Sequence, residues 1–239
     1  MRLRSLSKLA GLTIGAACLA SSASAQSVFI EQIGADNVAN VSQSGEGNGG
    51  QGLGARIRQT SSNSVANVTQ DGDDNDFLIS QSGKGAHKAD LDQSGADNLA
   101  NISQDGDAPN QATVVQSGFS NRATVTQASA LFGHQAFVSQ SGVGNGASIG
   151  QTGSGQTASI YQTGDGNSSS IDQSGESNTA TFTQTGDNNS LSGVQTGAGN
   201  VLTLSQIGDG LTAPTVTQTG GSNISVTQTA GAPLFVLPK

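Results

Sequence analysis

The residues of this 239-residue chain that could do chemistry are two histidines, one cysteine and two dense clusters of acidic residues or glycines. Nucleophilic catalysis needs a nucleophile beside a base, and a zinc site needs three or four ligands close together. His87 and His134 lie far apart in the sequence, Cys18 lies near the N-terminus, and no pair of carboxylates is spaced to converge. Serine is abundant, but nothing marks one serine as a nucleophile. The sequence therefore predicts no enzyme and no cofactor.

The two clusters match known binding motifs only in part. The segment "DGDDND", from Asp71 to Asp76, offers carboxylates to calcium, but its spacing fits neither the EF-hand loop nor the nine-residue calcium β-roll repeat. The segment "GEGNGG", from Gly45 to Gly50, satisfies G-x-G-x-x-G, but no helix is predicted after it and no acidic residue is placed to bind a ribose. We interpret both segments as turns and expect no metal site.

Residues 1–25 have the features of a secretory signal peptide. Three basic residues precede the apolar stretch "LAGLTIGAACLA", which is too short to span a bilayer, and "ASA" before Gln26 fits a cleavage site. Cleavage leaves a mature chain without cysteine and with 6 of the 9 basic residues against 17 acidic ones, so the formal net charge changes from −8 to −11. An acidic exported chain repels nucleic acid and anionic membranes. No later apolar run is long enough to cross a bilayer, so we expect neither nucleic acid nor a membrane span.

Composition alone is typical of a disordered chain. Only 33% of the residues are hydrophobic and 3% are aromatic, whereas ordinary globular domains contain about 45–50% apolar residues. Such a chain cannot bury enough apolar surface to form a conventional core. An intrinsically disordered matrix polymer is therefore one hypothesis, and it is opposed by a strict internal repeat.

The repeat is marked by eighteen glutamines, most of them eleven residues apart. Gly stands two residues after fifteen of them, and Val, Ile, Leu or Phe stands two residues before seventeen. Ala stands four residues before eleven, and Asn six residues before ten. Both histidines occupy the Asn position, so we interpret them as substitutions within the repeat. The glutamines are Gln32, Gln43, Gln59, Gln70, Gln81, Gln93, Gln104, Gln116, Gln127, Gln140, Gln151, Gln162, Gln173, Gln184, Gln195, Gln206, Gln218 and Gln228.

This spacing predicts short β-strands. Side chains two residues apart share one face of a strand, so Asn, Ala, the aliphatic residue and Gln all face the same way. The face with the recurring aliphatic residues must be buried, and Gly supplies the positive φ angle of a tight turn. The predicted inward residues include Asn37, Ala39, Val41, Gln43, Asn98, Ala100, Ile102, Gln104, Asn121, Ala123, Val125, Gln127, Asn178, Ala180, Phe182 and Gln184. The predicted turn glycines include Gly34, Gly95, Gly106 and Gly175.

The inward glutamines give the repeat a physical purpose. A buried amide without a partner costs ~1–3 kcal/mol. Stacked strands in register remove this cost, because each amide then bonds to the identical amide about 4.8 Å above and below it. Two facing strands are needed to bury both inward faces, so the eighteen units predict an all-β fold, a parallel β-solenoid of about nine two-strand coils over residues 26–228. His87 and His134 then lie on one wall two coils apart.

Residues 229–239 are predicted to form a separate C-terminal tail. Its sequence "GAPLFVLPK" contains Pro233 and Pro238, which oppose ladder hydrogen bonds. We expect the tail to cover part of the last coil or to dock on a partner.

The pattern Q-x-G-x-x-N-x-A-x-x-x-Q resembles the curlin repeat of bacterial curli fibres. Several units match every fixed position, and the resemblance extends over roughly residues 26–228. It implies that the chain is secreted through an outer-membrane pore and polymerises with itself into an extracellular amyloid fibre or pilus at the cell surface, used in biofilm matrix and adhesion. It also implies a partner of the same family, a nucleator or a major subunit, and leaves open which of the two this chain is. Among the matching units are those that begin at Gln32, Gln93 and Gln173.

A monomeric solenoid that binds ice or another surface is the alternative function. Such a protein needs a flat outer face with regularly spaced threonines on successive coils. Thr179, Thr181 and Thr183 fit this requirement, but the equivalent positions of another unit are Val38, Asn40 and Ser42.

Overall fold

The computed structural model describes residues 27–49, 54–230 and 235–238, and this part of the chain contains nineteen strands and no helix. The predicted signal peptide lies outside the described residues. The strands are β1 (Val28–Gln32), β2 (Val38–Ser44), β3 (Ala55–Gln59), β4 (Val65–Asp73), β5 (Asp76–Gln81), β6 (Lys88–Ala96), β7 (Leu99–Gly106), β8 (Gln111–Phe119), β9 (Arg122–Ser129), β10 (Gln135–Val143), β11 (Gly146–Ser154), β12 (Thr157–Thr163), β13 (Ser168–Glu176), β14 (Thr179–Thr185), β15 (Ser190–Ala198), β16 (Val201–Ile207), β17 (Val216–Thr219), β18 (Asn223–Thr229) and β19 (Phe235–Pro238).

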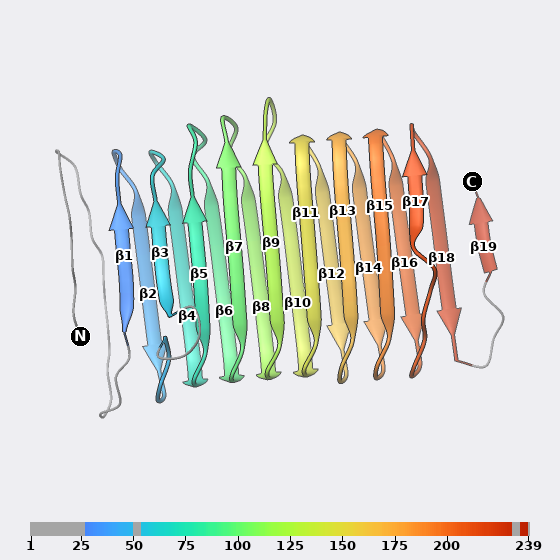
Figure 1. The fold of residues 1–239 in the computed structure, drawn as a ribbon, viewed down its shortest axis with the longest axis horizontal. Helices are drawn as coiled ribbons and strands as arrows, with labels where there is room; N and C mark the ends of the chain where they lie inside the picture. The colour runs from blue at the N-terminus through green and yellow to red at the C-terminus, as the bar shows by residue number, and fades with distance from the viewer. Residues whose placement is uncertain (1–26, 50–53, 231–234, 239) are drawn as a thin grey trace.

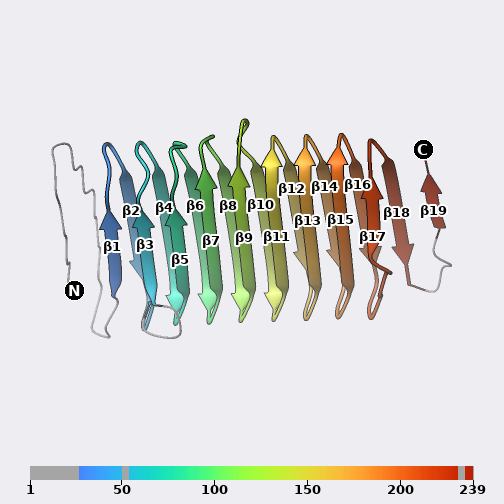
Figure 2. The same cartoon turned by 45° about the horizontal axis from the view of Figure 1, so that its top comes forward.

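The strands form two sheets that face each other. Odd-numbered strands from β1 to β17 make a nine-stranded sheet in chain order, and even-numbered strands from β2 to β18, with β19 beyond them, make a ten-stranded sheet. Each coil contributes one strand to each sheet, and the coils follow one another along the long axis of the molecule (Figure 1). Figure 2 shows the odd-numbered strands in front of the even-numbered ones. The predicted parallel β-solenoid of about nine two-strand coils is confirmed.

Every parallel pairing keeps glutamine opposite glutamine, as in Gln32↔Gln59, Gln104↔Gln127 and Gln162↔Gln184. A slip of one residue would turn the whole buried face toward solvent, so the register is strongly specified. Extra residues in the longer repeats are accommodated in turns. Between Gln127 and Gln140, for example, the strands β9 and β10 keep their register and the turn between them is longer.

The space between the sheets is filled by the small and aliphatic residues of the repeat. Ala100, Ile102, Val125 and Ile160 are each 0% exposed, and all sixteen predicted inward residues are buried. Buried residues alternate with partly or fully exposed ones along most strands, as in β7 and β14. Ala narrows the gap between the walls, which lets a chain of low hydrophobic content form a continuous dry core.

Gly193, the exception at the aliphatic position, is explained by the residue opposite it. A Cβ atom at Gly193 would lie 2.5 Å from Cζ of Phe182 and 2.6 Å from Cδ2 of Leu202. Phe182 is itself fully buried, at 0% exposure, and is larger than the aliphatic residues at its position in most other strands. The Phe182 ring therefore occupies the volume that an aliphatic side chain at residue 193 would fill.

The turn glycines are required by both conformation and close stacking. Gly95 has φ 101° and Gly175 has φ 108°, which side chains with a Cβ atom rarely adopt. A Cβ at either residue would lie 2.1 Å from a carbonyl oxygen of the next coil, that of Gly118 or Gly197. The predicted turn residues Gly34 and Gly106 also have positive φ angles, and a Cβ atom at either would likewise lie too close to a carbonyl oxygen of the next coil.

The C-terminal coil departs from the repeat. Strand β17 has only four residues, and Pro214 precedes it at the position where other units have Ala. The tail prolines are expected to oppose ladder pairing, but Phe235–Pro238 forms β19, which pairs antiparallel with β18. An edge strand tolerates proline because one side of it has no partner, and Pro233 lies outside the described residues. The expected covering of the last coil therefore takes the form of a strand.

Replacing Gly193 with Val should lower the free energy of unfolding by about 1–3 kcal/mol, because the new side chain overlaps the ring of Phe182. Gly146→Val is the matched control, since a Cβ at Gly146 meets no atom within 4 Å. Adding Phe182→Val to Gly193→Val should recover most of the loss. Urea unfolding of the monomer measures all four proteins, and equal losses for the two glycine variants would contradict this packing.

Candidate assembly site: the buried amide ladders

The glutamines form two hydrogen-bonded ladders, one in each sheet. In both ladders Nε2 of each glutamine donates to Oε1 of the glutamine one coil further toward the C-terminus, as from Gln104 to Gln127 at 3.0 Å and from Gln162 to Gln184 at 2.9 Å. All rungs therefore point the same way. The first ladder joins Gln32, Gln59, Gln81, Gln104, Gln127, Gln151, Gln173, Gln195 and Gln218. The second joins Gln43, Gln70, Gln93, Gln116, Gln140, Gln162, Gln184, Gln206 and Gln228.

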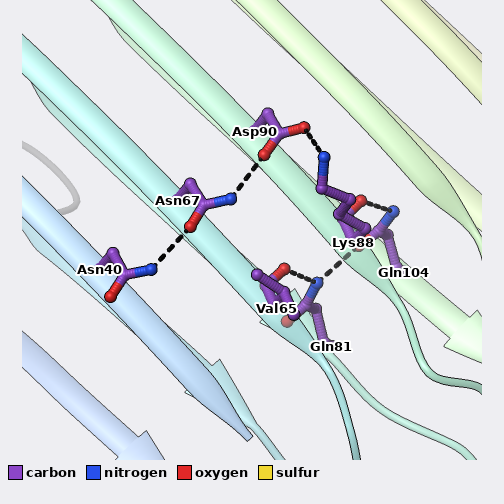
Figure 3. A network of polar contacts seen from close by, with 7 residues as sticks. All are labelled: Asn40, Val65, Asn67, Gln81, Lys88, Asp90 and Gln104. Carbon is purple, nitrogen blue, oxygen red and sulfur yellow. Dashed lines mark hydrogen bonds and ion pairs between the residues drawn. The ribbon is translucent and has the colours of Figure 1, made fainter. Parts of the chain in front are cut away.

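The glutamine Nε2 also links the two sheets. Gln81 donates to the carbonyl oxygen of Val65 at 3.0 Å, and Gln104 donates to that of Lys88 at 2.9 Å (Figure 3). Val65 and Lys88 are the first residues of β4 and β6. The glutamines near the ends of β5 and β7 therefore bond to the starts of the preceding strands, which belong to the other sheet. The amide of Gln104 thus uses both of its N–H groups and its oxygen. Sequence reasoning missed these carbonyl partners, because a backbone carbonyl is present at every residue.

The asparagine side chains form hydrogen bonds with backbone groups at the corners of the coils. Oδ1 of Asn98 accepts from the backbone N–H of Asn121 at 3.1 Å, and its Nδ2 donates to the carbonyl oxygens of Ser94 and Gly118. Side-chain bonds between identical asparagines also occur, as from Asn121 to Asn98. The expectation that each inward amide bonds mainly to an identical amide is therefore incomplete for Asn. The asparagine side chain is shorter and lies at a turn, where backbone groups need partners.

The two histidines replace asparagine in this corner network. Asn110 lies between them: its N–H donates to Nδ1 of His87 at 3.2 Å, and its Oδ1 accepts from the N–H of His134 at 2.9 Å. Nδ1 of His134 likewise accepts from the N–H of Gln156, and the Nε2 atoms donate to the carbonyl oxygens of Ser82 and Ala128. Each ring is therefore a neutral imidazole with its proton on Nε2. Burial lowers both pKa values, and the hydrogen bond from His87 to Ser82 and the charge of Asp105 oppose this at His87.

The acidic segment contains the end of β4, the turn residues Asp74 and Asn75, and the first residue of β5. It stacks on residues 45–49 of the glycine-rich segment, whose last residue, Gly50, lies outside the described residues. Oδ1 of Asp73 accepts from the N–H of Glu46 at 2.8 Å, and Nδ2 of Asn48 donates to the carbonyl oxygen of Gly72 at 2.7 Å. Aspartates cap backbone groups in the same way further along, where Asp187 accepts from the N–H of Asp165 at 2.8 Å. Within residues 27–49, 54–230 and 235–238, no group of three or more His, Cys, Asp or Glu is arranged to hold a metal ion.

The outer faces carry mixed side chains. On the even-numbered sheet, Asn40 donates to Asn67 at 2.9 Å, Asn67 donates to Asp90 at 2.8 Å, and Lys88 forms an ion pair with Asp90 (Figure 3). Further along this sheet, Thr179, Thr181 and Thr183 stack on Val201, Thr203 and Ser205. The spaced threonines of a lattice-binding face are thus not kept from coil to coil.

Two facing sheets, each with a continuous amide ladder, define a structural repeat protein, in which each coil is held by its neighbours. Residues 95–128, 135–164 and 164–197 match the family model of the curlin associated repeat. These residues are therefore curlin associated repeats, as the glutamine pattern predicted. No curated protein is similar enough to the chain to count as a match. Among the described residues, no helix has the length and hydropathy to cross a membrane.

Gln104→Ala should lower the free energy of unfolding by about 2–4 kcal/mol and slow fibre growth, because Gln81, Gln127 and the carbonyl of Lys88 each lose a buried partner. Ser103→Ala, one residue away on the outward face, should change stability by less than about 0.5 kcal/mol. Chemical unfolding and thioflavin T growth curves measure both variants. Equal effects would contradict an inward amide ladder.

Stability should fall with acid between pH 6.5 and 5 because of the two histidines. Their folded pKa values lie below the unfolded value of 6.5, so the unfolded state binds more protons as the pH falls through this range. Asn is the common residue at both positions and cannot ionise, so His87→Asn combined with His134→Asn should lose less stability than the wild type between pH 7.5 and 5. Urea unfolding at both pH values measures this, and equal losses would refute the role of the histidines.

Proposed function

We propose that the mature chain is a structural subunit of an extracellular, curli-like amyloid fibre. The observation that carries this proposal is that each end of the molecule has a glutamine amide without a full set of hydrogen-bond partners. Oε1 of Gln32 is buried and accepts no hydrogen bond from any described residue. At the opposite end, Gln218 and Gln228 are the last rungs of the described ladders. Nε2 of Gln218 donates to the carbonyl oxygens of Val201 and Ser222, whereas Nε2 of Gln228 has only a long contact of 3.5 Å with the carbonyl oxygen of Thr212. A second copy that continues the stack would offer a glutamine donor to Oε1 of Gln32 and a glutamine acceptor to Nε2 of Gln228.

The direction of the ladders sets how two copies meet. All Nε2 donors point toward the C-terminal end, so a C-terminal face offers donors and an N-terminal face offers acceptors. Head-to-tail stacking continues the ladders, whereas joining two like faces would place donor against donor or acceptor against acceptor. Strands β1 and β2 end their sheets in the hydrogen-bonding order, and such edges template pairing with another chain.

The wider role follows from the curlin resemblance. The fibre would lie at the cell surface after secretion through an outer-membrane pore, and would bind cells to surfaces and to one another in a biofilm matrix. Its partners would be further copies of this chain and a family member that acts as nucleator or major subunit. The repeats offer mechanical continuity and hydrogen-bond partners, which suits a structural role and no chemical reaction.

Incubation of the mature chain, residues 26–239, tests this function. We expect filaments that raise thioflavin T fluorescence and give a meridional fibre reflection at about 4.8 Å, because the strands lie across the filament axis. Ice recrystallisation in the presence of the same chain is the parallel measurement. A monomer that stays soluble for days at micromolar concentration and reshapes ice would contradict the fibre and favour the surface-binding alternative.

A further inference from the structure

The C-terminal edge of the even-numbered sheet is already occupied. Strand β19 pairs with β18 in the only antiparallel pairing among the described strands, and it lies at the end of the molecule beyond β18 (Figure 1). The facing residues are Ile224↔Pro238, Ser225↔Leu237, Val226↔Val236 and Thr227↔Phe235. A second copy that continued this sheet would need the same edge of β18.

The pairing of β19 with β18 is incomplete compared with a coil of the repeat. It spans four residue pairs, whereas β16 pairs with β18 over seven. It also stops short of Gln228, whose Nε2 has only a long contact of 3.5 Å with the carbonyl oxygen of Thr212. The edge of β18 is therefore covered, but the amide ladder is not continued.

Strand β2 of a second copy fits this edge better. Within one chain β2 pairs with β4 over seven residues and places Gln43 opposite Gln70. Placed on β18 in the same register, β2 would set Val41 opposite Val226 and offer Oε1 of Gln43 to Nε2 of Gln228. It therefore forms more backbone pairs than β19 and adds the missing rung.

In the part of the chain that the structure describes, no strand covers the other sheet at this end. Strand β17 is the last of the nine-stranded sheet. It has four residues and β1 has five, so the two strands are of similar length. In register, Gln218 lies opposite Gln32 of the second copy, whose buried Oε1 lacks a donor among the described residues. Pro214 has no N–H and would lie opposite Val28, where β1 begins. One sheet can thus dock while the other is still covered.

We infer that β19 is a displaceable strand cap, and that the surface beneath it is the binding site for β2 of a second copy. This inference rests on the proposed function. The incoming copy first docks β1 on β17, and its β2 then replaces β19 on β18. The cap protects a sheet edge from unwanted pairing, which soluble proteins with exposed edges must do, and it makes joining a two-step process.

A reversible disulfide between β18 and β19 tests the cap. Ser225 and Leu237 face each other across the pair, and facing residues of antiparallel strands lie about 4.5–5.5 Å apart at Cα, within the range of a disulfide. The mature chain has no other cysteine, so Ser225→Cys with Leu237→Cys gives one possible crosslink. We expect the oxidised protein to elongate at least tenfold more slowly than the same protein after reduction, and the two single variants to behave as the reduced protein. A chain that ends at Ala230 should have a shorter lag than the wild type.

The outcomes distinguish the inference that β19 is a cap from the proposal that the chain forms a fibre. Oxidised and reduced proteins that elongate at the same rate, a crosslink that does not form, or a slower chain ending at Ala230 would overturn the cap while the fibre stands. Polymerisation of the chain ending at Ala230 beside a monomeric wild type would support the cap strongly. Failure of the wild type, the reduced variant and the shortened chain to polymerise would overturn the proposed function itself.

Discussion

A glutamine amide buried in a dry core needs partners at fixed positions, and the rest of the solenoid follows from that requirement. An amide has two donors and one acceptor oxygen with two lone pairs, and Gln104 meets this need with Gln81 and Gln127 along the stack and Lys88 across it. Identical partners above and below exist only if strands are parallel and in register. The repeat, the turn glycines that permit close stacking and the restriction of insertions to turns are all consequences.

The same requirement explains how a chain with so few hydrophobic residues folds. Each coil buries a few Ala and aliphatic side chains, and its buried polar groups form hydrogen bonds with the neighbouring coils. The stability of the molecule is therefore a sum of contributions from single coils and from contacts between adjacent coils. Each interior coil therefore rests on neighbours of the same kind, and such a stack suits the extension by further copies that we propose. Much of the charge lies on the outside: Asp73 is exposed at the end of β4, and Asp165 and Asp187 are exposed in the turns after β12 and β14. Their repulsion opposes lateral association and leaves the ends as the favourable contacts.

Much of this could be predicted from the sequence, because a repeat states the same constraint many times. Spacing alone indicated the buried face, the two-strand coil and the opposition of glutamines. It did not indicate the bond from Gln81 to the carbonyl of Val65, since backbone groups leave no mark in a sequence. The antiparallel β19 was missed because its prolines argued against a strand, and the match of Gly193 with Phe182 depends on which strands face each other. What escaped prediction was thus set by the backbone or by a single tertiary contact.

Solid-state NMR of fibres grown from chain labelled in glutamine side chains with 15N and 13C addresses the amide ladder directly. If the ladder runs through the fibre, Nε2 of each glutamine lies next to Cδ of the glutamine one coil away. Strong contacts between different glutamines should then appear, with side-chain amide protons protected from exchange. Glutamines that exchange freely with solvent and show no contacts with one another would contradict the ladder.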